Sequence, residues 1–199
     1  MGRVSQAQAR ENRQRVVETA SRLFREQGVD VSVADLMQAA GLTHGGFYKQ
    51  FASKEALVDE ATAHAFAERA RQYEEDAARY AGASGPDAPG ADARAVARRD
   101  LIDAYLSPEH RDNPAEGCPI AGLATDMART PADRDAHHTY ARGAEAYAGR
   151  LADEDGDDDG LTRLSTMVGA LVLARATRGT PLSDEILKTV RTSLTRPEV

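Results

Sequence analysis

Two short segments of helical character lie on either side of the three residues Gly41, Leu42 and Thr43. The first segment begins after Ser32 and the second ends at about Gln50, and both carry apolar residues at helical spacing. Two short helices joined by a tight turn that contains glycine form the helix-turn-helix pattern. This pattern restricts the N-terminal part of the chain to a small helical unit built around that turn.

Helical periodicity continues through the rest of the chain. Alanine and arginine are abundant and runs of valine and isoleucine are scarce, a composition that favours helices over strands. The spacing of apolar residues predicts a first helix from Arg10 to Gly28 and a fourth from Ser53 to about Tyr80. Later helices are predicted at about 94–106, 118–129 and 131–153, from about 161, and after Pro181. We therefore expect an all-α protein of about nine helices, with no strand.

Short polar residues mark the expected starts of several helices. Ser32 and Asp35 stand three residues apart, as the two members of a capping box do. Other N-cap residues are expected at Thr43, Ser53, Thr130 and Ser183. Pro108 and Pro114 are expected to break the chain between helices.

The charges divide unevenly along the chain. The 199 residues carry a net charge of −7, which by itself argues against a nucleic-acid partner. Residues 1–54, however, hold eight basic and five acidic residues, whereas the remaining 145 hold 17 basic and 27 acidic ones. The balance is therefore +3 in the N-terminal unit and −10 in the rest of the chain. This asymmetry suggests that the N-terminal unit, and not the body, meets an anionic partner.

Several classes of protein and of site are excluded by what the sequence lacks. Cys118 is the single cysteine, so we expect neither an intrachain disulfide nor a cysteine-cluster zinc site. No apolar run reaches the roughly 20 residues that span a bilayer, and the polar N-terminal stretch is unlike a signal peptide. We expect no metal, no cofactor and no membrane partner, and a cytoplasmic location.

Two adjacent glycines, Gly45 and Gly46, lie inside the short third helix, although each costs about 1 kcal/mol relative to alanine there. Glycine removes a side chain at a point where the backbone must approach another surface closely. We interpret the pair as allowing this helix to approach a sugar-phosphate backbone. The alternative is that Gly46 only packs tightly against the first helix.

The order of these residues closely resembles the DNA-binding domain of the tetracycline-repressor (TetR) family. In that family a first helix ending in F-x-x-x-G precedes a helix-turn-helix that ends in G-x-x-Y-x-x-F-x-[SN]-K-E-x-L. The second pattern is present here as Gly45, Tyr48, Phe51, Ser53, Lys54, Glu55 and Leu57. The resemblance covers about residues 10–60, and two later segments, 117–128 and 171–187, more loosely resemble the C-terminal domain of one subgroup.

The resemblance implies a division of labour between two domains. It implies a helix-turn-helix DNA-binding domain over residues 1–56 and a larger helical domain for ligand binding and dimerisation over residues 57–199. Members of the family are mostly homodimeric, ligand-responsive bacterial repressors of transcription. Double-stranded DNA, a second copy of the chain and a small-molecule effector are thus the implied partners.

The resemblance and the residue types together predict the DNA-contacting surface. In this motif the short third helix enters the major groove with its N-terminal residues toward the base edges. Tyr48 resembles the aromatic residue that contacts the DNA backbone in the family, whereas Phe47 and Phe51 are expected in the core. The predicted DNA-binding residues are Thr43, His44, Gly45, Tyr48, Lys49 and Lys54, with Arg3, Arg10 and Arg13 on an N-terminal arm. The alternative for Tyr48 is a half-buried core role. The alternative for Lys54 and for the three arginines is a solvated side chain.

The last two predicted helices are candidates for dimerisation. A two-fold dimer doubles the DNA contact and implies a palindromic operator with half-sites about one helical turn apart. The predicted dimerisation residues are Leu164, Met167, Val168, Leu171, Ile186, Leu187, Val190 and Leu194. The alternative is that the same apolar stripe forms an ordinary core within one chain.

An effector site is expected among the helices from about 94 to 178. Polar-tipped and adaptable side chains there would suit a small amphipathic or aromatic molecule. The candidate ligand-binding residues are Tyr105, Met127, Tyr140, Tyr147 and Met167, although any of them can equally be plain core.

Three functions compete at this point. The first is a repressor that binds a palindromic operator and is released by a small molecule, and the second is a DNA-binding regulator without such a ligand. An enzyme is the third, and no nucleophile elbow, metal-ligand spacing, phosphate loop or paired carboxylate supports it. We predict a regulator, and not an enzyme.

Overall fold

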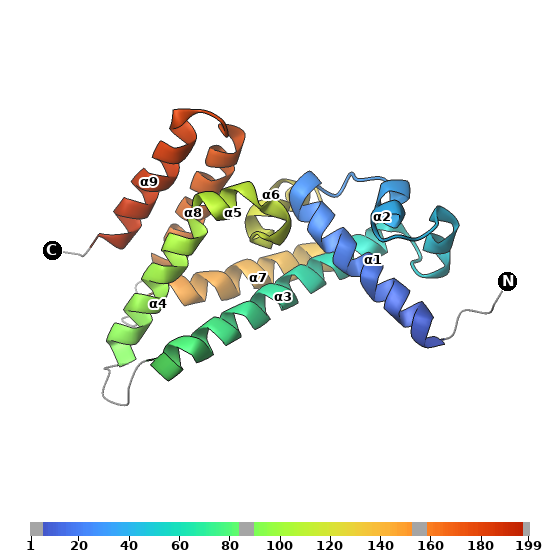
Figure 1. Cartoon of the computed structure of the whole chain (residues 1–199), viewed down its shortest axis with the longest axis horizontal. Coiled ribbons are helices and arrows are strands. Elements are labelled where there is room, and N and C mark those ends of the chain that lie inside the picture. The colour runs from blue at the N-terminus through green and yellow to red at the C-terminus, as the bar shows by residue number, and fades with distance from the viewer. Residues whose placement is uncertain (1–5, 84–89, 153–158, 197–199) are drawn as a thin grey trace. The chain divides into compact units, whose positions relative to one another are not determined.

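The computed structural model describes residues 6–83, 90–152 and 159–196, and the side chains within these ranges except at 77–83 and 90–94. Every regular element in these ranges is a helix (Figure 1). The elements are α1 (Gln6–Gln27), α2 (Val33–Ala39), η1 (His44–Lys49), α3 (Lys54–Ala83), α4 (Gly90–Tyr105), α5 (Pro108–Asp112), η2 (Pro114–Glu116), α6 (Pro119–Met127), α7 (Asp135–Leu151), α8 (Asp159–Ala176) and α9 (Pro181–Thr195). The predicted all-α fold class is confirmed.

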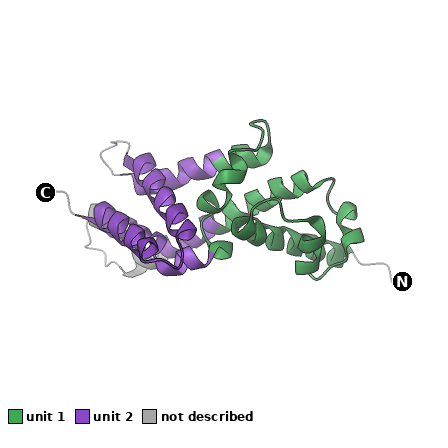
Figure 2. Cartoon of the chain, turned by 90° about the horizontal axis from the view of Figure 1, so that it is seen from above, with its two compact units in different colours: residues 1–68, 114–140 green, residues 69–113, 141–199 purple. Residues whose placement is uncertain are grey.

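The chain forms two compact units, coloured separately in Figure 2. Unit 1 contains residues 1–68 and 114–140, and unit 2 contains residues 69–113 and 141–199. The helices α3 and α7 each contribute residues to both units. This division by packing differs from the functional division at residues 56 and 57, which stays a prediction.

The turn of the helix-turn-helix lies between α2 and η1, as predicted. Gly41 adopts a φ of +71°, a conformation that side chains disfavour. The Leu42 amide donates to the Met37 carbonyl (2.8 Å) and the Gly41 amide donates to the Gln38 carbonyl (3.0 Å), which together close α2 in a Schellman motif. Gly28 ends α1 with a φ of +84°.

Two of the predicted N-caps form the expected hydrogen bonds. The Ser32 hydroxyl accepts from the Asp35 amide (3.1 Å), which confirms the predicted N-cap. The Asp35 carboxylate accepts from the same hydroxyl (2.6 Å), whereas in a capping box it would accept from the Ser32 backbone amide. The Ser53 hydroxyl accepts from the Ala56 amide (3.2 Å) in the first turn of α3. Thr43 occupies the N-cap position of η1, but its side chain makes no capping hydrogen bond there.

The third helix differs from the expected α-helix, because η1 is a 3₁₀ helix. Its Gly46 amide donates to the Thr43 carbonyl (2.9 Å), and the Gln50 amide donates to the Phe47 carbonyl (2.8 Å). Short segments with poor helix formers commonly tighten into this geometry. The two glycines therefore lie in a short and tightly wound segment.

The start of α7 was predicted at Thr130 and Pro131, and this prediction is wrong. The Thr130 hydroxyl instead donates back to the Asp126 carbonyl at the end of α6 (2.9 Å), and α7 begins at Asp135. A residue distant in sequence supplies the cap: the Asp59 carboxylate on α3 accepts from the Ala136 amide (3.0 Å) and pairs with Arg134 (2.6 Å).

Two further predictions about helix boundaries are corrected in the second half of the chain. Pro108 and Pro114 do not simply break the chain, because each begins a short helix, α5 and η2. Ser183 does not cap α9, which begins at Pro181 with Thr180 at the N-cap position. The buried Ser183 hydroxyl instead donates to the Ala174 carbonyl of α8 (2.7 Å).

Unit 2 is organised around the packing of α8 against α9. Arginines fix the short helix α5 to both of them. Arg111 on α5 pairs with Asp184 of α9, and Arg175 of α8 donates to the carbonyls of His110 (2.9 Å) and Arg111 (3.2 Å). Polar contacts therefore hold these three helices in one arrangement.

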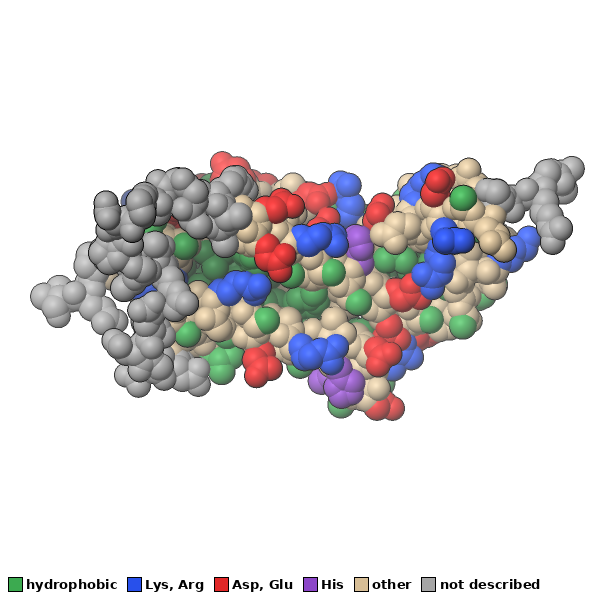
Figure 3. Space-filling view, turned by 90° about the horizontal axis from the view of Figure 1, so that it is seen from below, with side chains coloured by type: hydrophobic (Ala, Val, Ile, Leu, Met, Phe, Trp, Pro, Cys, Tyr) green, Lys and Arg blue, Asp and Glu red, His purple; other side chains and the backbone are tan. Residues whose placement is uncertain are grey.

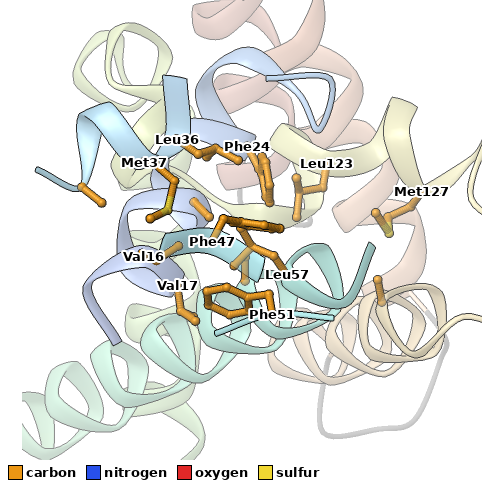
Figure 4. Packing of buried hydrophobic residues seen from close by; sticks show 14 residues of the cluster. Val16, Val17, Phe24, Leu36, Met37, Phe47, Phe51, Leu57, Leu123 and Met127 are labelled. Atoms are coloured by element: carbon orange, nitrogen blue, oxygen red, sulfur yellow. The ribbon is translucent and has the colours of Figure 1, made fainter. Parts of the chain in front are cut away.

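Unit 1 has a single apolar core, shown in Figure 4. It joins the helix-turn-helix to residues far along the chain, because Leu123 and Met127 of α6 and Ala136 of α7 pack with it. The remaining members come from α1, α2, η1, the start of α3 and the residues between them: Val16, Val17, Ala20, Phe24, Leu36, Met37, Ala40, Phe47, Phe51, Leu57 and Ala61. The motif is thus not an independent layer, and α6 is part of its support.

One buried arginine fixes the packing of α1 against α6. Arg25 is 4% exposed, and its guanidinium donates to the Gly117 carbonyl (3.1 Å) and pairs with Glu68 (2.9 Å). Gly122 of α6 lies directly against its backbone, so that a Cβ at Gly122 would stand 3.0 Å from the Arg25 carbonyl oxygen. A side chain at position 122 would therefore force the two helices apart.

None of the described helices is both long and apolar enough to cross a membrane.

We expect Gly122→Val to lower the free energy of unfolding by about 1–3 kcal/mol, the usual cost of overpacking. The matched control is Gly149→Val on α7, where nothing lies within 4 Å of an added Cβ. This control should be neutral or slightly stabilising, because valine is a better helix former than glycine. Urea unfolding of both variants measures the difference, and equal effects would show that α1 and α6 are not in close contact.

Candidate nucleic-acid interface

The side of η1 that carries the predicted DNA contacts faces solvent. Thr43, His44, Gly45 and Lys49 are exposed, and the Tyr48 side chain is 67% exposed. The half-buried alternative for Tyr48 is therefore excluded in the free chain. An exposed large aromatic residue beside a lysine is suited to contact with a phosphate backbone.

The other side of η1 is anchored by two phenylalanines. Phe47 is fully buried and Phe51 nearly so, and their ring centroids are 5.4 Å apart. Figure 4 shows both rings within the core of unit 1, near Val17 and Leu57. The Tyr48 ring meets the Phe47 ring edge-on at 5.1 Å. The core placement predicted for both phenylalanines is confirmed, and it holds the exposed face of η1 in a fixed orientation.

The two glycines of η1 have different surroundings. No atom lies within 4 Å of the position that a Cβ would take at Gly45, so this glycine opens directly to solvent. A Cβ at Gly46 would stand 3.6 Å from Met37 Cε and 3.9 Å from Thr43 Oγ1. Gly46 is thus packed within the motif, although against α2 and not against the first helix. Of the two glycines, only Gly45 leaves its backbone open to the close approach of another molecule.

Lys54 is the first residue of α3 and is partly buried, at the positive end of the helix dipole. Glu55 follows it, and hydrogen bonds from its own amide and from Ser53 lower the pKa of this carboxyl group. A carboxylate therefore accompanies the lysine. Basic side chains are also interspersed with acidic ones on the face of the molecule in Figure 3.

The three arginines predicted on an N-terminal arm have different outcomes. Arg3 lies outside the described residues. Arg10 and Arg13 lie within α1, which begins at Gln6, so the arm prediction is wrong for both. Arg10 is exposed. Arg13 is engaged within unit 1, where its guanidinium pairs with Glu60 (2.6 Å) and lies over the Phe51 ring (4.7 Å).

The residues predicted for dimerisation separate into two groups. Leu164, Met167, Leu171 and Leu187 are almost fully buried within the chain, which is the alternative of an intrachain core. The dimerisation prediction is therefore wrong for these four residues, because side chains already packed inside unit 2 cannot form the surface of an interface. The others, Val168, Ile186, Val190 and Leu194, are half-buried. Leu161, Val172 and Leu182, which were not predicted, are exposed large apolar residues of the same two helices.

The candidate ligand-binding residues also divide between the two units. Met127 belongs to the core of unit 1, and Tyr140 in that unit donates its hydroxyl hydrogen to the Ile120 carbonyl (2.8 Å). Burial raises the pKa of Tyr140 to about 12. Tyr105, Tyr147 and Met167 belong to unit 2 and are buried. Of the five, Tyr105 and Tyr147 are in direct contact, with ring centroids 5.9 Å apart.

These two tyrosines belong to a row of aromatic rings inside unit 2. His110 meets Tyr105 at 4.7 Å, and Tyr73 meets Tyr147 at 5.4 Å. The Arg150 guanidinium lies over the Tyr73 ring at 4.8 Å. Burial lowers the pKa of His110 to about 4, although the bond from its Nδ1 to the Tyr105 carbonyl (2.7 Å) opposes this shift. The imidazole is therefore neutral at physiological pH. We call the four residues Tyr73, Tyr105, His110 and Tyr147 the aromatic row.

Cys118 is buried at the start of α6. Within the described ranges, no group of three or more His, Cys, Asp or Glu side chains is arranged to hold a metal ion.

The helix-turn-helix matches a known family of proteins. A family model described as "Bacterial regulatory proteins, tetR family" matches residues 16–61. The HTH-type transcriptional regulator AcrR of Shigella flexneri is 39% identical over 61 residues, which make up 30% of this chain and 28% of that protein. Residues 16–61 of this chain thus match the DNA-binding domain of the TetR family. The matched region spans little more than a quarter of AcrR, so this comparison covers only part of either protein.

Solved structures extend the likeness to the rest of the fold. A TetR transcriptional regulator from Chloroflexus aurantiacus aligns with a TM-score of 0.68 at 24% identity, over 95% of this chain and 94% of that one. The reduced form of E. coli NemR aligns with a TM-score of 0.65 at 16% identity, over 92% and 95%. The multidrug binding protein EbrR, in complex with imidazole, aligns with a TM-score of 0.55 at 22% identity, over 94% of this chain and 92% of that one. At these identities the likeness is one of fold.

Two outcomes of the sequence analysis follow from these comparisons and from the structure. The proteins that the chain matches are described as regulatory proteins, in agreement with the predicted regulator. Sequence reasoning missed Tyr73 and His110, because Tyr73 lies in a polar stretch of α3 and His110 lies between two prolines. Neither residue takes part in an apolar periodicity, and no local signal could have placed them beside Tyr105 and Tyr147.

Proposed function

We propose that this chain is a homodimeric transcriptional repressor that binds a palindromic operator and is released by a small-molecule effector. The proposal places η1 in the major groove of each half-site, with the start of α3 on the phosphate backbone. It also places the protein in the cytoplasm, where its DNA would be.

One observation carries the DNA-binding part of this proposal. The exposed face of η1 combines an open glycine, an exposed tyrosine and an exposed lysine, and its opposite face is fixed by Phe47 and Phe51. A narrow element that is anchored from behind and bare at Gly45 can approach a duplex without rearrangement. This face lies within residues 16–61, the segment that matches the family.

Selection of bound sequences from random duplex DNA tests the proposal. A repressor of this kind should enrich a palindrome with half-sites about one helical turn apart. If six to eight phosphates are contacted per dimer, log K should fall with log salt at a slope of about −5 to −7. Failure to enrich any sequence, with salt-independent binding, would refute the proposal.

Gly45→Val separates the role of this glycine in DNA binding from a role in folding. The added side chain meets no atom of the protein, so the unfolding midpoint should stay the same or rise slightly. The affinity for the selected operator should fall about tenfold or more, because the branched side chain would separate the helix from the duplex. An unchanged operator affinity would show that Gly45 does not lie at the interface.

The structure suggests a revised dimerisation surface on unit 2. On α8 the outward residues Leu161, Val168 and Val172 share one face at helical spacing. On α9 the partly or fully exposed residues Leu182, Ile186 and Val190 form a similar stripe. Two such helices from each of two chains would give a four-helix interface. This surface replaces the four buried leucine and methionine residues of the sequence-based prediction.

Val172→Asp tests this surface, with Leu173→Asp as its control. Val172 is 43% exposed and lies on the outward stripe, whereas its neighbour Leu173 is 57% exposed and points about 100° away around the helix. The aspartate at 172 should give a monomer in sedimentation velocity and weaken operator binding at least about tenfold. The aspartate at 173 should leave the dimer intact. Dimers of equal stability in both variants would exclude the surface.

The aromatic row is the effector site that the contacts favour. Its tyrosine and histidine side chains offer ring faces together with polar tips, which suits a small aromatic molecule. To act as an inducer, such a molecule must bind more tightly to the conformation that does not fit the operator. The row contains Tyr105 and Tyr147, two of the five residues predicted from the sequence.

A thermal-shift screen with aromatic compounds tests the effector, and Tyr147→Phe locates it. A compound that binds at the row should raise the unfolding temperature of the native protein, release the operator, and show a smaller shift with Tyr147→Phe. Tyr140→Phe is the control, because its hydroxyl bonds to Ile120 in unit 1 and lies outside the row. If no compound shifts the melting temperature, the alternative of a regulator without a small-molecule ligand is favoured.

A further inference from the structure

Arg13 has three contacts that converge on the end of η1. Its Nη2 pairs with Glu60 Oε1 of α3 at 2.6 Å, and its Nε donates to the Gln50 carbonyl at 3.4 Å. The plane of the guanidinium lies over the Phe51 ring, with Cζ 4.7 Å from the ring centroid. A single side chain on α1 thus contacts the residues that immediately follow η1 and the helix that comes after them.

These contacts act on the end of η1, a short helix whose first turn contains two glycines. The Phe47 carbonyl accepts from both the Gln50 amide (2.8 Å) and the Phe51 amide (3.0 Å), and this bond pair closes η1. Residues 45 and 46 are glycines, which leave the backbone more conformational freedom than other residues would. The direction in which η1 presents Tyr48 and Lys49 therefore depends on how its last turn is held from outside.

The contacts of Arg13 contribute orientation more than stability. The side chains of Arg13 and Glu60 are 42% and 38% exposed, and an ion pair of that exposure adds little to the free energy of folding. A guanidinium, however, is a planar group that can stack on a ring and donate in two fixed directions at once. Lysine carries the same charge but cannot satisfy these three partners together.

We propose that Arg13 is a positioning residue for the recognition element, and not a ligand of the DNA phosphates. Its charge is balanced by Glu60, and its hydrogen-bonding directions are directed into unit 1. The inference rests on the proposed DNA-binding function and assigns to Arg13 a role in sequence-specific binding. Arg10, which is exposed one turn earlier on the same helix, is the matched residue for a direct phosphate contact.

Arg13→Lys separates the two roles when specific and non-specific binding are measured together. If Arg13 positions η1, the lysine variant should bind the selected operator roughly five- to tenfold more weakly, with unchanged affinity for random duplex and an unchanged salt slope. If Arg13 contacts phosphate, a lysine preserves both affinities to a similar extent, and that result would overturn the proposal.

Arg13→Gln, Arg10→Gln and Glu60→Gln complete the comparison. Loss of a phosphate contact lowers both affinities and reduces the salt slope by about 0.9 per contact, or roughly 1.8 per dimer. This behaviour is expected of Arg10→Gln, and its appearance in Arg13→Gln would contradict the proposal. The double variant Arg13→Gln/Glu60→Gln should bind the operator no more weakly than Arg13→Gln, because both substitutions break the same contact. Additive losses would instead show that the two residues act separately.

A measurement without DNA keeps this inference distinct from the proposed function. Amide hydrogen exchange of Gln50 and Phe51 should be faster in Arg13→Lys than in the native chain and unchanged in Arg10→Lys, with equal unfolding midpoints for all three. If the native protein binds no DNA, the proposed function fails, and exchange still decides whether Arg13 fixes the end of η1. Unchanged exchange in Arg13→Lys would refute the positioning role directly.

Discussion

The burial of Phe47 and Phe51 is the interaction on which the recognition surface depends. An element of six residues with two glycines does not have the propensity to hold its own shape. The two rings attach it to a core shared by α1, α2, α3 and α6, so its orientation is set by tertiary packing. As a consequence, the exposed residues of η1 are not needed for its attachment to the core and can instead contact a partner.

Two arginines of α1 connect this core to its surroundings in different ways. Arg25 is buried, and its contacts with Gly117 and Glu68 tie α1 to the segment that leads into α6 and to α3. Arg13 is partly exposed, and its contacts hold the end of η1. The basic residues of the N-terminal unit are therefore not equivalent, although the net charge counts them alike. Arg13, Arg22 and Arg25 form ion pairs within unit 1, whereas Arg10 and Lys49 are exposed.

Features set by neighbouring residues could be predicted from the sequence. The Ser32 cap, the stop at Gly41 and the buried side of η1 all follow from local spacing, and the structure has them. Features set by distant residues could not be predicted. The cap of α7 by Asp59 joins residues 77 positions apart, and the pairing of Arg13 with Glu60 joins residues 47 apart. The apolar stripe of α8 shows the same limit, because periodicity identifies a buried face without saying whether the partner belongs to the same chain.

The most direct test of the account is amide hydrogen exchange of the native chain with and without its selected operator duplex. The account predicts that DNA protects residues 43–49 and the first turn of α3, whereas the amides of α8 and α9 exchange at the same rate in both samples. Protection confined to unit 2, with η1 exchanging as fast as in the free protein, would show that the exposed face above Phe47 and Phe51 is not the DNA-binding surface.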